Sequence, residues 1–161
     1  MGEATSELYR LTESLGPGEL TDVDPAFMEG LPGDSLLAGL GIVLQRIGRG
    51  ASRAEMTVGR GHLNQRGIAQ AGAVVALADA AAGWASYSAI PDGKFTTLNL
   101  EVSLLRPARD GDRLVAEAHP VHLGRRTHVL EVLVTREDAP EKPLARFTCT
   151  QMVLSDAVGA S

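Results

Sequence analysis

A single charge, Asp79, interrupts the longest apolar segment of the chain. Residues 70–88 read QAGAVVALADAAAGWASYS, with eight alanines, no proline and no other charged residue. Aspartate is almost never fully buried unless it is paired or functional. Burial raises the pKa of a carboxyl group and neighbouring hydrogen-bond donors lower it, so this position could hold a carboxyl group tuned for reaction. A structural aspartate that pairs within an interface would give the same pattern.

A second candidate lies just before this segment, in the stretch NQRGIAQAG that begins at Asn64. Gly67 and the turn Gln70-Ala71-Gly72 precede the expected helix, whose first residues offer free backbone N–H groups and partial positive charge. Such a helix terminus can stabilise the oxyanion of an acyl-transfer reaction, and glycine lets the backbone approach a ligand closely. An ordinary turn with an ordinary helix cap would look the same in the sequence.

The two candidates are too far apart to meet within one chain. Nine residues separate Gln70 from Asp79, which is ~13.5 Å along a helix at about 1.5 Å per residue. An aspartate side chain cannot span that distance. If both features serve one reaction, they come from different subunits. This predicts a homodimer with two symmetric sites, each built from both chains.

Several other kinds of site have no matching pattern. The four histidines lack close metal-ligand spacing, and a multi-cysteine zinc site is excluded because Cys149 is the only cysteine. The sequence contains no G-x-S-x-G turn and neither of the common nucleotide-phosphate loops. We therefore expect neither a metal nor a cofactor.

Charge is unevenly distributed along the chain. The net charge is −5, but residues 1–34 hold eight acidic residues and one arginine and so carry −7, which leaves +2 for the remainder. Thirteen of the fifteen basic residues are arginine. Arg106, Arg109, Arg125 and Arg126 lie at expected strand ends, where they could bind the phosphates of a carried acyl group or be solvated turn residues.

The elements that position these residues are a hairpin, a long helix and four strands. Apolar residues alternate on both sides of a turn at residues 48–50, and again in residues 97–104, 113–122, 127–135 and 144–154. The alanine-rich segment 70–88 predicts a helix buried on nearly every side. The expected fold class is α+β, with a strand-rich sheet around one helix and the last four strands in a meander.

The length of 161 residues fits one domain with its own core. We expect residues 1–34 to form an acidic arm with short helices and residues 35–161 to form the main domain. No secretory signal is visible. The helix does not read as a membrane span, because an aspartate at its centre would cost ~2.5–3.5 kcal/mol. We expect a cytoplasmic protein that binds neither membranes nor nucleic acid.

Two motifs together resemble a known family. The stretch N-Q-R-G-I-A-Q-A-G with Asp79 in the following helix, and the strand T-L-N-L-E-V-S-L-L-R-P-A-R, are similar to those of hotdog-fold acyl-CoA thioesterases of the phenylacetate-pathway and 4-hydroxybenzoyl-CoA thioesterase type. The resemblance covers about residues 38–154. It implies an antiparallel sheet of about six strands wrapped around a central helix. It also implies dimers, often paired into tetramers, with sites at the subunit interface.

The resemblance also implies roles for individual residues. Asp79 matches the catalytic carboxylate, which acts as general base for water or as nucleophile. Asn64 matches a polar residue that helps to place the water or the thioester, and the Ala71 N–H matches the group that polarises the thioester carbonyl. Thr97 matches a hydroxyl that helps to hold the water. Residues expected to contact CoA are Gly72, Arg106, Arg125 and Arg126.

This chain departs from the family pattern at two positions. Gln70 stands where histidine is usual, and Ala71 stands where the first glycine is usual. The Ala71 N–H survives the change if φ stays negative. Glutamine can donate and accept hydrogen bonds but cannot titrate near neutrality, so a mechanism that needs an imidazole here is disfavoured.

The resemblance predicts hydrolysis of an acyl- or aroyl-CoA thioester to the free acid and CoA. Two alternatives remain. One is a non-catalytic hotdog module that binds acyl-CoA without turning it over, which Gln70 and Ala71 favour. The other is an enoyl- or hydroxyacyl-CoA hydratase-dehydratase on the same fold. Gln70 disfavours the second alternative because those enzymes rely on a histidine.

Overall fold

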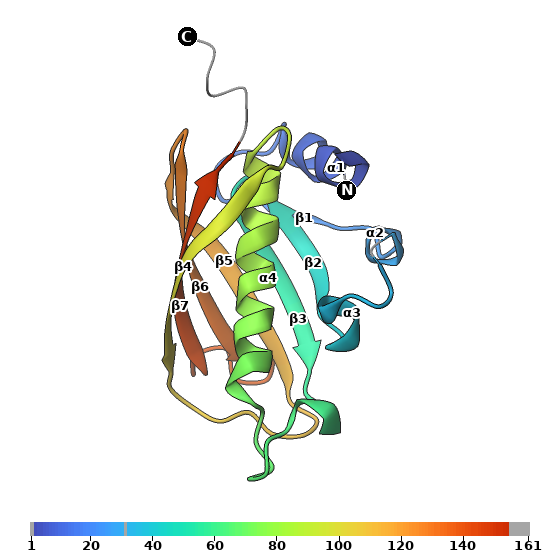
Figure 1. The fold of residues 1–161 in the computed structure, drawn as a ribbon, viewed down its shortest axis with the longest axis vertical. Coiled ribbons are helices and arrows are strands. Elements are labelled where there is room, and N and C mark those ends of the chain that lie inside the picture. Colours follow the sequence, from blue (N-terminus) through green and yellow to red (C-terminus); the bar gives the residue numbers. More distant parts are fainter. Residues whose placement is uncertain (1, 31, 155–161) are drawn as a thin grey trace.

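The computed structural model describes residues 2–30 and 32–154, and it shows one long helix, α4 (Ala71–Ala89), packed against an antiparallel sheet (Figure 1). The seven strands are β1 (Thr21–Asp22), β2 (Val43–Gly48), β3 (Ala51–Thr57), β4 (Phe95–Leu104), β5 (Arg113–Leu123), β6 (Thr127–Arg136) and β7 (Ala145–Val153). The other helices are α1 (Gly2–Thr12), α2 (Ala26–Glu29), α3 (Leu36–Gly39) and the 3-10 turn η1 (Arg60–His62). The predicted α+β hotdog architecture is confirmed, and the two-residue β1 is the addition to the six expected strands.

The order of the strands differs from the expected meander. The sheet runs β1-β2-β3-β5-β6-β7-β4, so β5, β6 and β7 follow one another but β4 lies at the far edge beside β7. Leu100 of β4, for example, lies opposite Cys149 of β7. The expectation of a four-strand meander was wrong because the chain leaves the sheet after β3 and crosses the sheet's inner face as α4. It re-enters at the opposite edge.

Helix α4 lies close to the sheet because its side chains are small. The Ser52 hydroxyl of β3 donates to the Ala81 carbonyl at 2.7 Å, a contact that a bulkier helix face would prevent. From Ala73 onward every residue of α4 is buried or half-buried, as the sequence predicted. Cys149 is fully buried in the same core. Within the described residues, no helix is both long and apolar enough to cross a membrane.

The N-terminal arm is tied to the end of α4. The Thr12 hydroxyl donates to the Ser88 carbonyl at 3.0 Å, and Leu8 is buried in the shared core. Tyr9 lies 5.8 Å from the guanidinium of Arg49, within range of a cation–π contact. Further along, β1 pairs with β2 and extends the sheet. The arm therefore packs on α4 and on the β2 edge.

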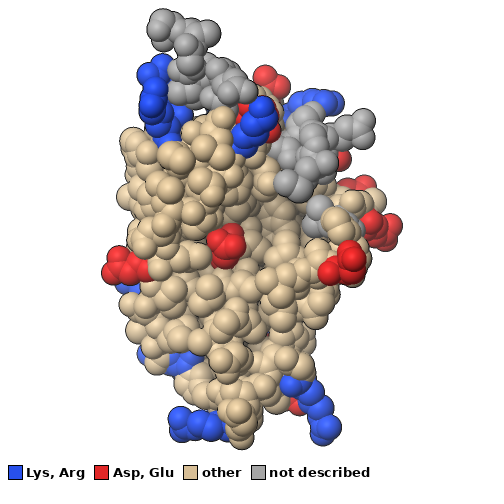
Figure 2. All heavy atoms as spheres, viewed as in Figure 1, with Lys and Arg blue, Asp and Glu red and all other residues tan. Residues whose placement is uncertain are grey.

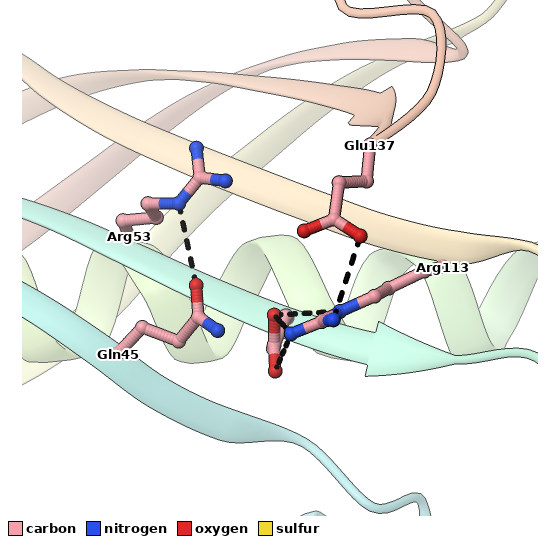
Figure 3. A network of polar contacts seen from close by, with 5 residues as sticks. Gln45, Arg53, Arg113 and Glu137 are labelled. Carbon is pink, nitrogen blue, oxygen red and sulfur yellow. Dashed lines mark hydrogen bonds and ion pairs between the residues drawn. The ribbon is translucent and has the colours of Figure 1, made fainter.

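Polar contacts cover the outer face of β2, β3 and β5 (Figure 3). Arg53 donates to Gln45 at 3.3 Å, and Arg113 binds Glu55 through two nitrogens and lies 3.4 Å from Glu137. Ion pairs whose charges remain in contact with solvent contribute little to stability. Their main consequence is that this face is polar while the opposite face holds the core.

Candidate active site

A tight loop brings Asn64 to the start of α4. The Asn64 side-chain oxygen accepts from the Arg66 N–H at 2.9 Å, and its backbone carbonyl accepts from the Gly67 N–H at 3.0 Å. Gly67 has a φ of 70°, a left-handed conformation that glycine adopts without strain. The Ala69 N–H donates to the Ala108 carbonyl at 2.8 Å, so the loop is also fixed to the chain that follows β4.

The N-terminus of α4 is held in place by His62. The ring Nδ1 accepts from the Gly59 N–H at 2.8 Å, so Nε2 carries the proton and donates to the Leu40 carbonyl at 3.1 Å. The His62 carbonyl accepts from the Gln70 N–H at 2.7 Å. Gln70 is the N-cap residue in extended conformation, and its exposed side chain makes no capping hydrogen bond. The sequence alone did not identify this role of His62.

A groove of about 500 Å³ opens at this helix terminus. It lies between the loop before α4 and the segment after β4, and it contains three of the predicted catalytic residues and one predicted CoA contact. Its lining includes Asn64, Gln70, Ala71, Leu104 and Arg106. The first N–H groups of a helix have no partner within the helix. The groove therefore combines backbone donors, an amide side chain and a guanidinium, which suits a ligand with a carbonyl and phosphates.

Asp79 lies two turns further along α4, beside Thr97 of β4. Burial raises the pKa of Asp79, and a hydrogen bond from the Thr97 hydroxyl opposes that shift without cancelling it. A half-buried carboxyl group with a raised pKa is a stronger base than an exposed one. The structure thus brings together Asp79 and Thr97, two residues that are well separated in sequence.

Asp79 does not line the groove that holds Asn64, Gln70 and Ala71. This agrees with the helical spacing, which keeps the two groups apart within one chain. Beside both lies β4, an edge strand with exposed apolar side chains at Leu98, Val102 and Leu104. The face over α4 and β4 is largely uncharged, and basic side chains gather at its two ends (Figure 2).

The predicted CoA-binding residues fall into two groups. Arg106 lines the groove, and Gly72 is exposed beside it with room for a Cβ that would contact nothing within 4 Å. Arg125 and Arg126 lie in the β5–β6 turn, where the Arg126 carbonyl accepts from the Val153 N–H. That turn is near Thr97, because Thr97 lies opposite Gln151 in the neighbouring strand. It is at the other end of α4 from the groove.

The core also contains a polar cluster that the sequence analysis did not single out. Ser86, His128 and Gln151 are buried between α4 and the sheet and contact one another. The period-two alternation of β7 could have indicated it, because Gln151 lies in the same inward phase as the buried Phe147 and Cys149. No group of three His, Cys, Asp or Glu residues that could hold a metal ion occurs in the part of the chain that the structure describes.

Comparison with known families gives a match in the region that contains α4. The profile of the thioesterase superfamily matches residues 67–142. A Pseudomonas aeruginosa protein named "Putative esterase" is 34% identical over 95 residues, which is 58% of this chain and 65% of that protein. The chain therefore matches just under two thirds of the length of this relative.

Solved structures show the same architecture. A mutant of the phenylacetic acid degradation protein PaaI from Thermus thermophilus superposes with a TM-score of 0.69 at 32% identity, covering 75% of this chain and all of that one. The protein smu.793 of Streptococcus mutans, solved with acetyl-CoA bound, superposes with a TM-score of 0.66 at 28% identity. That alignment covers 71% of this chain and 89% of the other.

Proposed function

Because the chain belongs to the thioesterase superfamily, we propose that it hydrolyses an acyl- or aroyl-CoA thioester to the free acid and CoA. The observation that carries the proposal is the pairing of Asp79 with Thr97 on the inner side of an open sheet edge. Burial raises the pKa of this carboxyl group, and a hydroxyl donor lies against it. These are the properties of a general base placed beside a water molecule.

In the proposed reaction Asp79 takes a proton from water as the water oxygen attacks the thioester carbonyl carbon. The N–H of Ala71 and the positive end of α4 stabilise the oxyanion of the tetrahedral intermediate. The C–S bond then breaks, and the protonated Asp79 returns its proton to the CoA thiolate. Thr97 orients the carboxylate, and Asn64 contacts the thioester or the water.

The proposed site takes its two halves from two chains. Within one chain Asp79 lies outside the groove that contains Ala71. If β4 pairs antiparallel with β4 of a second copy, the two-fold axis reverses the partner, and its groove approaches the Asp79 of the first chain. The exposed apolar side chains of β4 support this pairing, because an unpaired edge strand of this kind is otherwise a liability.

The same pairing brings the two arginine groups together. Arg106 lies in the groove, while Arg125 and Arg126 lie at the opposite end of the sheet. A reversed partner places its β5–β6 turn beside the first chain's groove, so both groups can contact the phosphates of one CoA. The bound acetyl-CoA of the Streptococcus mutans relative supports CoA as the leaving group here.

The direct test measures CoA release from a panel of acyl- and aroyl-CoA thioesters, with the mass of the assembly read on the same sample. We expect turnover by a dimer or a pair of dimers. Asp79→Ala removes the base and lowers kcat by about 10²–10⁴, whereas the exposed Asp138→Ala serves as control and leaves kcat unchanged. An Asp79→Ala variant as active as wild type would refute the mechanism.

A second candidate is a module that binds acyl-CoA without hydrolysis. The specific observation in its favour is the exposed Gln70 amide at the position where the resemblance leads one to expect an imidazole. Tight binding of acyl-CoA by calorimetry, with no thiol released over hours, would select this alternative. Loss of enoyl-CoA absorbance would instead select a hydratase.

A further inference from the structure

Three buried polar side chains form a cluster on the inner face of the sheet, close to Asp79. Ser86 of α4, His128 of β6 and Gln151 of β7 are 0%, 4% and 0% exposed. We call them the Ser86–His128–Gln151 cluster. Polar groups this deep in a core need hydrogen-bond partners, so each donor and acceptor of the cluster should have one.

One donor in the cluster has no partner. The Ser86 hydroxyl donates its only hydrogen bond to the Gln151 side-chain oxygen, so its oxygen accepts a hydrogen bond from His128 Nδ1 at 3.1 Å. Burial lowers the pKa of His128, and the neighbouring charge of His122 adds to this, which keeps the His128 ring neutral at pH 7. Gln151 Nε2 then has no hydrogen-bond partner among the described residues.

An unpaired buried donor is unfavourable, because the group loses its water and gains nothing in return. Leucine or methionine at position 151 would fill the core without this penalty. The Gln151 amide is therefore best explained by a partner that the chain itself does not supply.

The position of Gln151 indicates what that partner is. On β7, Gln151 lies directly opposite Thr97 of β4 on one side and His128 of β6 on the other. Side chains at such paired positions project from the same face with Cβ atoms about 4.5–5.5 Å apart. Thr97 forms a side-chain hydrogen bond with Asp79. Burial raises the pKa of Cys149, two residues before Gln151, and the charge of Asp79 raises it further. The free amide is thus about one side chain away from the proposed reaction centre.

A glycine lies between the carboxylate and the cluster along α4. Gly83 lies one turn beyond Asp79 and just under one turn before Ser86, on the same side of α4. A Cβ built on Gly83 would meet, outside the helix itself, only Phe95 Cζ, at 3.7 Å. The Phe95 ring therefore occupies the space beside Gly83.

Phe95 packs against Gly83 from the side of β4. It is the first residue of the edge strand β4 and is only half-buried, with its ring edge against Tyr87 at 4.8 Å between centroids. A ring at the end of an edge strand can turn aside with little loss of packing. It then becomes part of an apolar wall along the path from Asp79 to Gln151.

We propose that Gln151 selects substrates whose acyl group carries an oxygen acceptor a short apolar distance from the thioester. The acyl chain enters beside Asp79, passes Gly83 and turns Phe95 aside, and its oxygen accepts a hydrogen bond from Gln151 Nε2. Ser86 and His128 hold the amide in the orientation that presents this donor. The inference rests on the proposed thioester hydrolysis and adds its substrate class, namely short oxo- or hydroxyacyl thioesters.

The test compares 5-oxohexanoyl-CoA with hexanoyl-CoA, which differ only in the remote carbonyl. For the wild type we expect kcat/KM to be about tenfold higher for the oxo substrate, the effect of one buried hydrogen bond. Most of the difference should lie in KM, because Gln151 contacts a part of the substrate that does not react. Gln151→Met should bring the ratio close to one by slowing only the oxo substrate.

Thr150→Val is the matched control, since it makes a similar polar-to-apolar change on the other face of β7. It should leave the ratio unchanged. A wild-type ratio near one, or a Gln151→Met variant that keeps the wild-type preference, would overturn the inference. The wild-type ratio decides the question even if Gln151→Met does not fold, which circular dichroism reveals.

The outcome separates this inference from the proposed function. If hexanoyl-CoA is hydrolysed and the oxo group brings no advantage, hydrolysis stands and the role of Gln151 fails. If no thioester is cleaved, the proposed function fails. Calorimetry with non-hydrolysable thioether analogues of the same two acyl groups then still measures whether the remote carbonyl is preferred.

Discussion

Two purified heterodimers can distinguish a site shared between chains from a site within one chain. The first variant is Asp79→Asn, which removes the proposed base and keeps an oxygen that accepts from Thr97. The second is Ala71→Pro, which removes the proposed oxyanion donor. Proline suits this position, because Ala71 is the first residue of α4 and Gln70 before it is extended, with φ −60° and ψ 134°.

The expected activities follow from counting intact sites. Each variant alone should retain about 1% of the wild-type rate or less, since a general base contributes about 10²–10⁴ and an oxyanion donor about 10²–10³. If each site takes Asp79 from one chain and Ala71 from the other, the Asp79→Asn/Ala71→Pro heterodimer contains one intact site of two. It should show about half of the wild-type activity.

The reciprocal heterodimer makes the opposite prediction. A chain with both substitutions, paired with a wild-type chain, places one defect in each shared site, so almost no activity should remain. If each site lies within one chain, the expected activities are reversed. The heterodimer of two single variants is then almost inactive, and the heterodimer with one wild-type chain has about half of the wild-type activity. Two affinity tags permit purification, and CoA release gives the rate. A half-active second heterodimer would refute the shared site.

Further substitutions probe stability and assembly. Burial raises the pKa of Asp79 in the folded protein, so the charged form lowers stability at neutral pH, and this loss disappears below the ordinary carboxyl pKa of about 3.9. Asp79→Asn should therefore melt at a higher temperature than wild type at pH 7 and at an equal temperature near pH 3; an equal gain at both would contradict the assignment. Val102→Lys on β4 should give an inactive monomer by light scattering, whereas Val43→Lys, at a similarly exposed position on β2, should leave the assembly intact. His62→Ala breaks the bonds to Gly59 N–H and the Leu40 carbonyl and should destabilise the chain by about 1–3 kcal/mol, or about 2–4 °C per kcal/mol by calorimetry; an unchanged melting temperature would exclude this role.

The sequence predicted the elements whose signals are local. An alanine-rich run without proline defined α4 to within one residue at each end, and period-two alternation located all the long strands. The position of β4 was not predictable in this way, because alternation reports which face of a strand is buried and not which strand lies beside it. The two residues of β1 are too few to show any period.

The candidate site was predictable only in part. Asp79 stood out as a charge in an apolar helix and Asn64 as a polar residue just before it, while the resemblance to thioesterases gave Asn64 a role and added Thr97. The contact of Asp79 with Thr97 is a tertiary one, which the structure supplies. The alternation of β7 places Gln151 on the buried face with Phe147 and Cys149, but its partners Ser86 and His128 come from other elements and could not be predicted from the sequence. His62 was missed because its role is made of backbone contacts, which leave no pattern in the sequence.

The two edges of the sheet have consequences for how far the protein can assemble. At one edge β1 covers part of β2 with only two residues, and Asp22 there contacts Arg46 at 3.2 Å. The other edge is the ten-residue β4, which exposes Leu98, Val102 and Leu104 and has no further strand beside it among the described residues. A sheet with one long unpaired edge strand can pair with one second copy, and in a two-fold pair that strand is then hydrogen-bonded in both chains. Growth into an extended filament needs two such edges, so the proposed pairing of β4 would end at a closed dimer of strands.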